Sequence, residues 1–150
     1  MSMKQQKHQK NLNLVLIKDP TPVYQDNFTP SKGNALQACV ASLFDQPLNR
    51  VPNFIILECG YLKGIQNFVG DSYVVLKKDL NSNNTQVDDG KLCILRGKSP
   101  RGDFAHVVIG RIVEGEVKKY KFIHDPHPDE TFLDTSKEDI GWYMIFDEKE

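Results

Sequence analysis

The spacing of apolar residues changes partway along this chain of 150 residues, and that change restricts the fold more than any other feature. In the first third, apolar side chains recur every three or four residues, which places them on one face of an α-helix. They are Leu36, Cys39, Val40, Leu43 and Phe44. Asn34 is a favourable N-cap residue, and Pro47 disfavours helical backbone in the residue before it. We therefore predict a buried helix that begins at Asn34 and ends near Asp45.

The second half of the chain is rich in short apolar or alternating segments, which are typical of β-strands. We predict strands over 72–78, 91–97, 104–113, 117–125 and 142–146, with a hairpin turn at 114–116. Upstream, the pattern predicts a strand over 13–18 and a second helix from Val51 to about Val69, opened by Pro52. This order indicates an α+β domain, with N-terminal helices packed on an antiparallel meander. We expect one domain over 11–150, preceded by a mobile basic tail over 1–10.

Composition narrows the class of protein. The 19 basic and 20 acidic residues give a net charge of -1, which does not indicate a nucleic-acid partner or an anionic membrane surface. No apolar run approaches the length of a membrane span. The three cysteines Cys39, Cys59 and Cys93 lack CxxC spacing, so we predict packing residues, no disulfide framework and a cytoplasmic, reducing location. Nothing in the sequence indicates a cofactor.

Two residues that can act as a base and its orienting group lie on the predicted hairpin. His106 is inside the apolar segment FAHVVIG, and Asp125 follows the next segment in IHDPHP. Pairing the strands about residue 115 places His106 opposite His124 or Asp125, where a carboxylate can fix the imidazole tautomer. The alternatives are a core histidine with a backbone partner and an aspartate that stabilises a turn.

The start of the predicted helix is a favourable place for a reactive thiol. Unpaired N–H groups and the helix dipole favour a thiolate there and can stabilise an oxyanion. Position 35 is occupied by alanine, however, and Cys39 lies one turn further along, on the buried face. A cysteine in apolar surroundings is usually a packing residue. We therefore predict that Cys39 packs in the core and that position 35 is the site a nucleophile would occupy.

Other polar residues extend the candidate site. Gln25 has a side-chain amide of the kind that donates to oxyanions, and Arg101 in SPRG has a guanidinium suited to a substrate carboxylate. Asn34 and His127 complete the candidate substrate-binding set. A metal-dependent hydrolase is a competing interpretation, because imidazole and carboxylate side chains are ligands that zinc prefers. Its ligands would be His106, His124, Asp125 and His127.

Three ordered motifs together resemble the papain-like cysteine peptidase superfamily. They are GNALQACVASLFDQPLNRVPNF at 33–54, SPRGDFAHVVIG at 99–110 and HDPHPDE at 124–130. The similarity is closer to the small domains that process bacteriocin leaders, and especially to single-domain relatives with the pattern GNCxQACxASLxxxPxxxVPxF. The resemblance covers roughly residues 23 to 130. It implies a papain-like fold without cofactor, with His106 as base, Asp125 as its orienting group and Gln25 as oxyanion donor.

The same resemblance places the nucleophile at Ala35, where this chain lacks the thiol. Either the chain is a natural pseudoenzyme that binds a peptide or protein, or alanine has replaced the nucleophile by design. The intact His106 and Asp125 motifs favour the second explanation. The resemblance implies a thiol hydrolase of peptide, isopeptide or other amide bonds, and deamidation or acyl transfer would use the same groups. With alanine at position 35, we expect the chain to bind its substrate but not to cut it.

Overall fold

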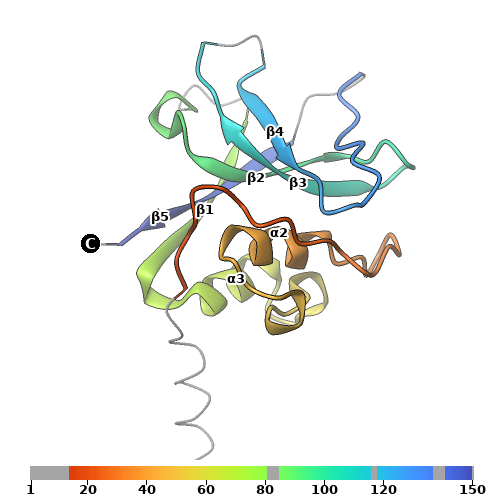
Figure 1. Ribbon diagram of the computed structural model, residues 1–150, viewed down its shortest axis with the longest axis horizontal. Coiled ribbons are helices and arrows are strands. Elements are labelled where there is room, and N and C mark those ends of the chain that lie inside the picture. The colour runs from red at the N-terminus through yellow and green to blue at the C-terminus, as the bar shows by residue number, and fades with distance from the viewer. Residues whose placement is uncertain (1–13, 81–84, 116–117, 137–140, 150) are drawn as a thin grey trace, which may run out of the picture.

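A five-stranded antiparallel sheet forms the centre of the computed structural model, which describes residues 14–80, 85–115, 118–136 and 141–149. Its strands are β1 (Tyr73–Asp79), β2 (Leu92–Lys98), β3 (Ala105–Ile112), β4 (Tyr120–His124) and β5 (Trp142–Glu148). Helices α2 (Ala35–Leu43) and α3 (Tyr61–Val69) lie against one face of this sheet (Figure 1). The predicted α+β class is therefore confirmed. The predicted tail over 1–10 lies outside the described residues.

The strand order corrects the predicted meander. The sheet has the order β1-β5-β2-β3-β4, so the last strand of the chain lies between the first two. Seven residue pairs join β5 to β1 and three pairs join it to β2. Local apolar spacing predicts that a segment is a strand, but it carries no signal for a partner about 65 residues away. The strands themselves fall where the sequence places them.

Helix α2 is the predicted helix. Its apolar face is buried against β3, and Cys39, Val40 and Leu43 have no exposed surface. The helix ends at Leu43, and Asp45 follows with a positive φ of 53°, a backbone conformation that cannot continue a helix. Pro47 then begins the next segment in extended conformation. The helix therefore ends two residues before the predicted Asp45, because the backbone of Asp45, which played no part in the prediction, already leaves the helical region before Pro47.

The predicted helix over 51–69 is wrong in its first half. Two short 3₁₀ turns, η1 (Leu48–Arg50) and η2 (Phe54–Ile56), precede α3. Val51 before Pro52 is extended, as the proline requires, and Gly60 has a φ of 89°, which interrupts helical geometry. The predicted first strand is also wrong for its described residues. The N–H groups of Leu16 and Ile17 donate to the Tyr73 hydroxyl and the Leu43 carbonyl, not to a sheet neighbour.

The central strands are buried on both faces, as their continuous apolar runs indicate. Ile94, Val107, Ile109, Met144 and Phe146 face the helices. The alternating residues Cys93, Leu95, Val108, Tyr143 and Ile145 form a second core on the opposite face.

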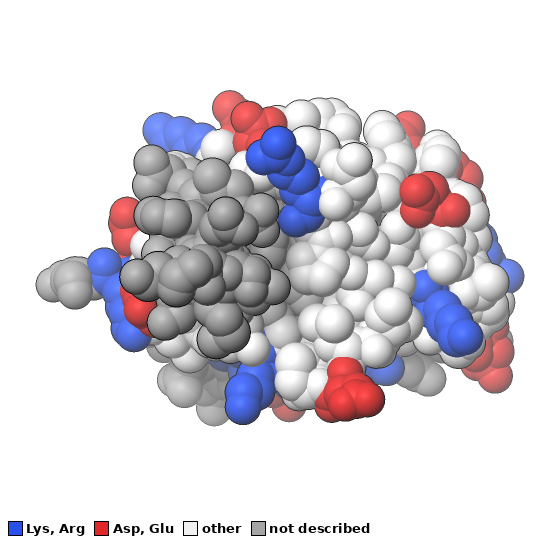
Figure 2. All heavy atoms as spheres, turned by 90° about the horizontal axis from the view of Figure 1, so that it is seen from below, with Lys and Arg blue, Asp and Glu red and all other residues white. Residues whose placement is uncertain are grey.

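On the helix-covered side of the molecule, acidic and basic side chains are interspersed around a largely uncharged area (Figure 2). Among the described residues, no helix has the length and apolar character needed to cross a bilayer.

A buried carboxylate fixes the second core at the end away from α2. Asp88 lies in the short turn η4 (Thr85–Asp88), and its residue is fully buried. It accepts hydrogen bonds from the Tyr143 hydroxyl at 2.6 Å, Lys78 at 2.9 Å and Lys91 at 3.1 Å. Burial alone would raise the pKa of Asp88, but these donors outweigh it and lower the pKa.

We expect Asp88→Asn to lower the free energy of unfolding at pH 7 by about 1.5–3 kcal/mol, because it removes a charge that three donors stabilise. Urea denaturation measures the loss, and the exposed Asp71→Asn is the matched control. Since folding lowers the pKa of Asp88, its contribution is complete above the unfolded value of about 3.9 and disappears as the pH falls through the folded value. A difference between the proteins that persists far below pH 3.9 would contradict this assignment.

Candidate active site

The first residue of α2 is held at the wall of a cavity by the loop before it. Ala35 begins the helix and is 9% exposed. Gly33 lets this loop pass close to the backbone of Thr29, since a Cβ atom at position 33 would lie 2.8 Å from the Thr29 carbonyl oxygen. The first helical hydrogen bond joins the N–H of Ala38 to Asn34, so the N–H groups of residues 35–37 precede the hydrogen-bonded part of the helix. A side chain at position 35 therefore lies at the positive end of the helix dipole.

Asn34 occupies the predicted N-cap position, but its side chain does not cap the helix. Its Oδ1 accepts hydrogen bonds from the N–H groups of Asp26 and Asn27 at 3.0 and 2.9 Å. Its Nδ2 donates to the Asp26 carboxylate at 2.8 Å. The predicted N-cap hydrogen bond is therefore absent. The backbone N–H groups of the nearby turn bind the Asn34 side chain in place of the N–H groups at the helix start. The hydrogen bonds of Asn34 therefore stabilise the loop that contains Gln25. Asn34 does not line the cavity that Ala35 lines.

His106 and Asp125 meet in a buried pair. The Nε2 atom of His106 in β3 lies 2.8 Å from Oδ1 of Asp125, which follows β4. The predicted register does not bring them together, because His124 pairs with Ile109 and not with a residue near 106. A register shift at Ile109 and Gly110 bends the strand, and a Cβ on Gly110 would lie 2.4 Å from Leu95. The chain leaves the ladder after His124, and the Asp125 side chain reaches back to His106.

Asp125 is held from three sides. In addition to His106, it accepts hydrogen bonds from the backbone N–H of His127 at 3.0 Å and of Phe132 at 2.8 Å. Burial alone would raise the pKa of Asp125, but these three donors outweigh it and lower the pKa. The carboxylate is therefore ionised at neutral pH. It fixes His106 with Nε2 bound, which leaves Nδ1 as the ring nitrogen available to another group.

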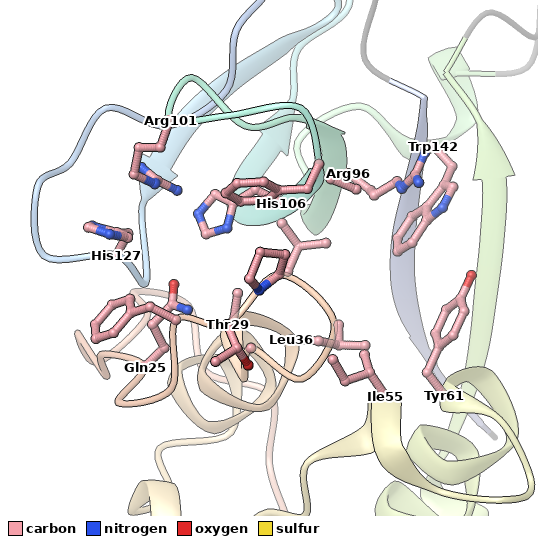
Figure 3. Close-up of a pocket in the computed structure, with 17 residues that line it drawn as sticks. Gln25, Thr29, Leu36, Ile55, Tyr61, Arg96, Arg101, His106, His127 and Trp142 are labelled. Atoms are coloured by element: carbon pink, nitrogen blue, oxygen red, sulfur yellow. The ribbon is translucent and has the colours of Figure 1, made fainter.

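A cavity of about 480 Å³ joins these elements. Its polar end carries Gln25, Arg101, His106 and His127, and its other end lies between α3 and β5 (Figure 3). Ala35 also lines this cavity. The remaining lining is mostly apolar and consists of Phe28, Thr29, Pro30, Gly33, Leu36, Ile55, Tyr61, Arg96, Phe104, Ala105, Val107 and Trp142. The sequence interpretation missed Arg96, Tyr61 and Trp142. A charged residue inside the apolar segment KLCILRG is the signal that could have indicated Arg96.

The side-chain amide of Gln25 points into the cavity near His106 and His127 (Figure 3). Its backbone N–H donates to the Pro126 carbonyl, which ties the Gln25 loop to the loop after Asp125. Its Nε2 donates to the Asn27 carbonyl at 3.0 Å, and its buried Oε1 has no hydrogen-bond partner among the described residues. An amide has two N–H donors, so one remains for a ligand atom.

Arg101 and His127 line the cavity as predicted for substrate-binding residues, but both also have partners in the protein. Nη1 of Arg101 donates to Asp129 at 2.9 Å and to Thr131 at 2.7 Å. Nδ1 of His127 accepts from the N–H of Asp129 at 3.1 Å. Burial and the nearby Arg101 cation lower the pKa of His127, so this ring is neutral at pH 7 and has its Nε2 for a ligand.

The cysteines separate into two groups. Cys39 and Cys93 are buried, as predicted for packing residues, whereas Cys59 is exposed and that prediction is wrong. Cys59 lies in the turn before Gly60 that replaces the predicted helix. Burial, with a smaller effect of the Asp125 charge, raises the pKa of Cys39 well above its ordinary value. Cys39 is therefore a poor nucleophile in the folded protein.

The residues of the metal interpretation do not converge. Nε2 of His124 donates to the Val23 carbonyl at 2.9 Å, and its ring packs on Tyr24. His106 is engaged with Asp125, and His127 with Asp129. Among all the residues that the structure describes, no group of three histidine, cysteine or acidic side chains has the arrangement of a metal site. We therefore set the metal-dependent hydrolase aside.

Comparisons of this chain with protein-family models, with curated proteins and with solved structures find no match.

Proposed function

We propose that this fold is a thiol-dependent amide hydrolase whose nucleophile stands at position 35. The observation that carries the proposal is the buried His106–Asp125 pair, 2.8 Å between Nε2 and Oδ1, beside a cavity that the first residue of a helix also lines. A general base held by a carboxylate and a helix start with free N–H groups are the components that thiol catalysis uses.

In this proposal the groups act in sequence. Nδ1 of His106 takes the proton of a thiol at position 35, and the Asp125 carboxylate stabilises the imidazolium. The thiolate attacks the carbonyl carbon, and the N–H of residue 35 with the Gln25 amide stabilises the oxyanion. His106 then returns the proton to the leaving amine, which breaks the C–N bond and leaves an acyl-enzyme. Water, deprotonated by His106, then attacks the acyl carbon; the C–S bond breaks, the acid leaves, and the thiolate at position 35 is regenerated beside the protonated ring. An amine in place of water would give acyl transfer, and a side-chain amide substrate would give deamidation.

Ala35 favours a second function for the chain as it stands. Without sulfur at position 35, the cavity keeps its oxyanion donors and its base but cannot form the acyl-enzyme. The chain is then a binding module for peptides or proteins that does not alter them. The same cavity serves both functions, so the residue at position 35 decides between them.

We expect Ala35→Cys to cut peptides that the Ala35 chain leaves intact. A proteome-derived peptide library is incubated with each protein, and mass spectrometry counts new termini, deamidated side chains and transferred acyl groups. Adding His106→Ala should lower the rate by about 10²–10⁴-fold, because it removes the general base. If Ala35→Cys has a reactive thiol at 35 and yields none of these products, the hydrolase proposal fails and the binding module remains.

A further inference from the structure

The cavity continues well beyond the residues of the proposed catalytic centre. Val107, Arg96 and Trp142 lie in one row across β3, β2 and β5, since Arg96 pairs with Val107 on one side and with Trp142 on the other. All three line the cavity. The row therefore starts beside His106 and leads to Tyr61 of α3, whose ring stacks on Trp142 with centroids 5.9 Å apart. Figure 3 shows Arg96 between His106 and the Tyr61–Trp142 pair.

The charges of this cavity have one sign. Among the residues that the structure describes, Arg96 and Arg101 line it together with two histidines, and no aspartate or glutamate does. Arg101 has the Asp129 carboxylate as its partner. The backbone carbonyl of Arg96 accepts a hydrogen bond from the N–H of Gly141 at 2.8 Å. Its exposed guanidinium, by contrast, has no hydrogen bond or ion pair within the described ranges 14–80, 85–115, 118–136 and 141–149. Within the described part of the chain, the Arg96 guanidinium at this cavity is therefore available to an anionic group, which it can bind through two parallel hydrogen bonds.

A second cation strengthens the positive potential at this end. Nζ of Lys77 lies 5.3 Å from the Tyr61 ring centroid and 5.5 Å from that of Trp142. It also donates a hydrogen bond to the Tyr61 hydroxyl at 2.8 Å. Lys77 thus contacts both rings without lining the cavity. The far end of the cavity therefore combines the two aromatic rings with the Arg96 guanidinium.

The spacing of the strands sets which part of a substrate reaches Arg96. Neighbouring strands are about 4.8 Å apart, and an extended peptide advances about 3.3 Å per residue. Arg96 is one strand from Val107, and Trp142 is two. If a peptide crosses the strands with its carbonyl at the Val107 end of this row, a side chain one or two residues from that carbonyl comes to the Arg96 guanidinium.

We propose that Arg96 makes this cavity selective for peptides that carry an aspartate or glutamate one or two residues from the carbonyl presented to position 35. The guanidinium binds the carboxylate, and the Tyr61–Trp142 pair packs against the apolar part of the same segment. The placement of the carbonyl rests on the function proposed above, while the preference for a carboxylate rests on the cavity alone.

Trp142 provides a direct reporter, because it is the only tryptophan of the chain and lines the cavity. The Ala35 chain is titrated with mixtures of N-acetylated, C-amidated hexapeptides in which one position is fixed as glutamate or as glutamine, and Trp142 fluorescence is recorded. For at least one position, the glutamate mixture should bind roughly tenfold more tightly, as expected for a hydrogen bond to a charged group. Equal affinity of the two mixtures at every position would overturn the proposal.

Arg96→Gln should remove the preference for glutamate and leave the glutamine mixtures unchanged. Arg111→Gln is the matched control, because Arg111 lies on β3, donates to the Gly90 carbonyl and does not line the cavity. It should keep the full preference. A glutamate preference that survives Arg96→Gln, or is lost in Arg111→Gln, would also overturn the proposal. Arg96 is exposed, so the substitution should not prevent folding, and Arg96→Met provides a second variant that lacks the charge.

The outcome is separable from that of the proposed function, because binding to the Ala35 chain requires no reaction. If Ala35→Cys fails to cut peptides while Arg96 still selects glutamate, the carboxylate site stands and the hydrolase does not. If Ala35→Cys cuts peptides without regard to acidic residues, the hydrolase stands and the role of Arg96 fails.

Discussion

Ala35→Cys is expected to create a thiol that iodoacetamide alkylates at pH 6 roughly ten times faster than a free cysteine, because a helix start and an adjacent imidazolium favour the thiolate. Cys59 is exposed and would react in parallel, so the test uses Cys59→Ser as background. Cys39 is buried, and its pKa is raised well above the ordinary value, so it should stay unmodified. Peptide mapping by mass spectrometry identifies which position carries the label.

The role of His106 supplies the control. In the Ala35→Cys, Cys59→Ser background, His106→Ala should return the alkylation rate at position 35 to that of a free cysteine. Because His106 is buried, its replacement could disturb the fold, so circular dichroism must show that the variant is folded. Labelling of Cys39 ahead of position 35 in the folded protein would contradict the assignment of the nucleophile position.

Asp125→Ala should produce the largest loss of stability among the polar residues of the site. The free energy of unfolding should fall by about 3–5 kcal/mol, the cost of removing one partner from a buried charged pair. His106 and the N–H groups of His127 and Phe132 would all lose their acceptor. Urea denaturation at pH 7 measures the change.

Asp125→Asn is the matched variant, since it keeps the shape and one acceptor oxygen while it removes the charge and replaces the other oxygen with an NH2 group. Its loss of stability should be clearly smaller than that of Asp125→Ala. Folding lowers the pKa of Asp125, so its stabilising effect is complete above the unfolded value of about 3.9 and is lost as the pH falls through the folded value. A change below about 0.5 kcal/mol for Asp125→Ala, the size typical of surface substitutions, would contradict this account.

Much of the fold could be predicted from local patterns. The buried face of α2 follows from helical spacing, and its approximate end follows from Pro47. The five strands follow from apolar runs and alternation. What local patterns do not contain is the insertion of β5 between β1 and β2, because strand partners distant in the sequence are chosen by the packing of the whole sheet.

The candidate site shows the same division. The types of its residues indicated a base and an orienting carboxylate, and the structure brings His106 and Asp125 together. The predicted contact between His106 and Asp125 is confirmed, but the predicted strand register is wrong. The shift at Ile109 and Gly110 changes the pairing of β3 with β4. Arg96 and Trp142 were missed because their strands become neighbours only in the folded sheet.

The central claim is that position 35 lies where His106 and Asp125 can stabilise a thiolate. The most direct test is the pH dependence of iodoacetamide alkylation of Ala35→Cys, Cys59→Ser, measured at position 35 between pH 4 and 10. The account predicts a rate that stays high well below pH 8.5, the ordinary pKa of cysteine, and that loses this low-pH reactivity when His106→Ala is added. A single titration near pH 8.5, unchanged by His106→Ala, would contradict it.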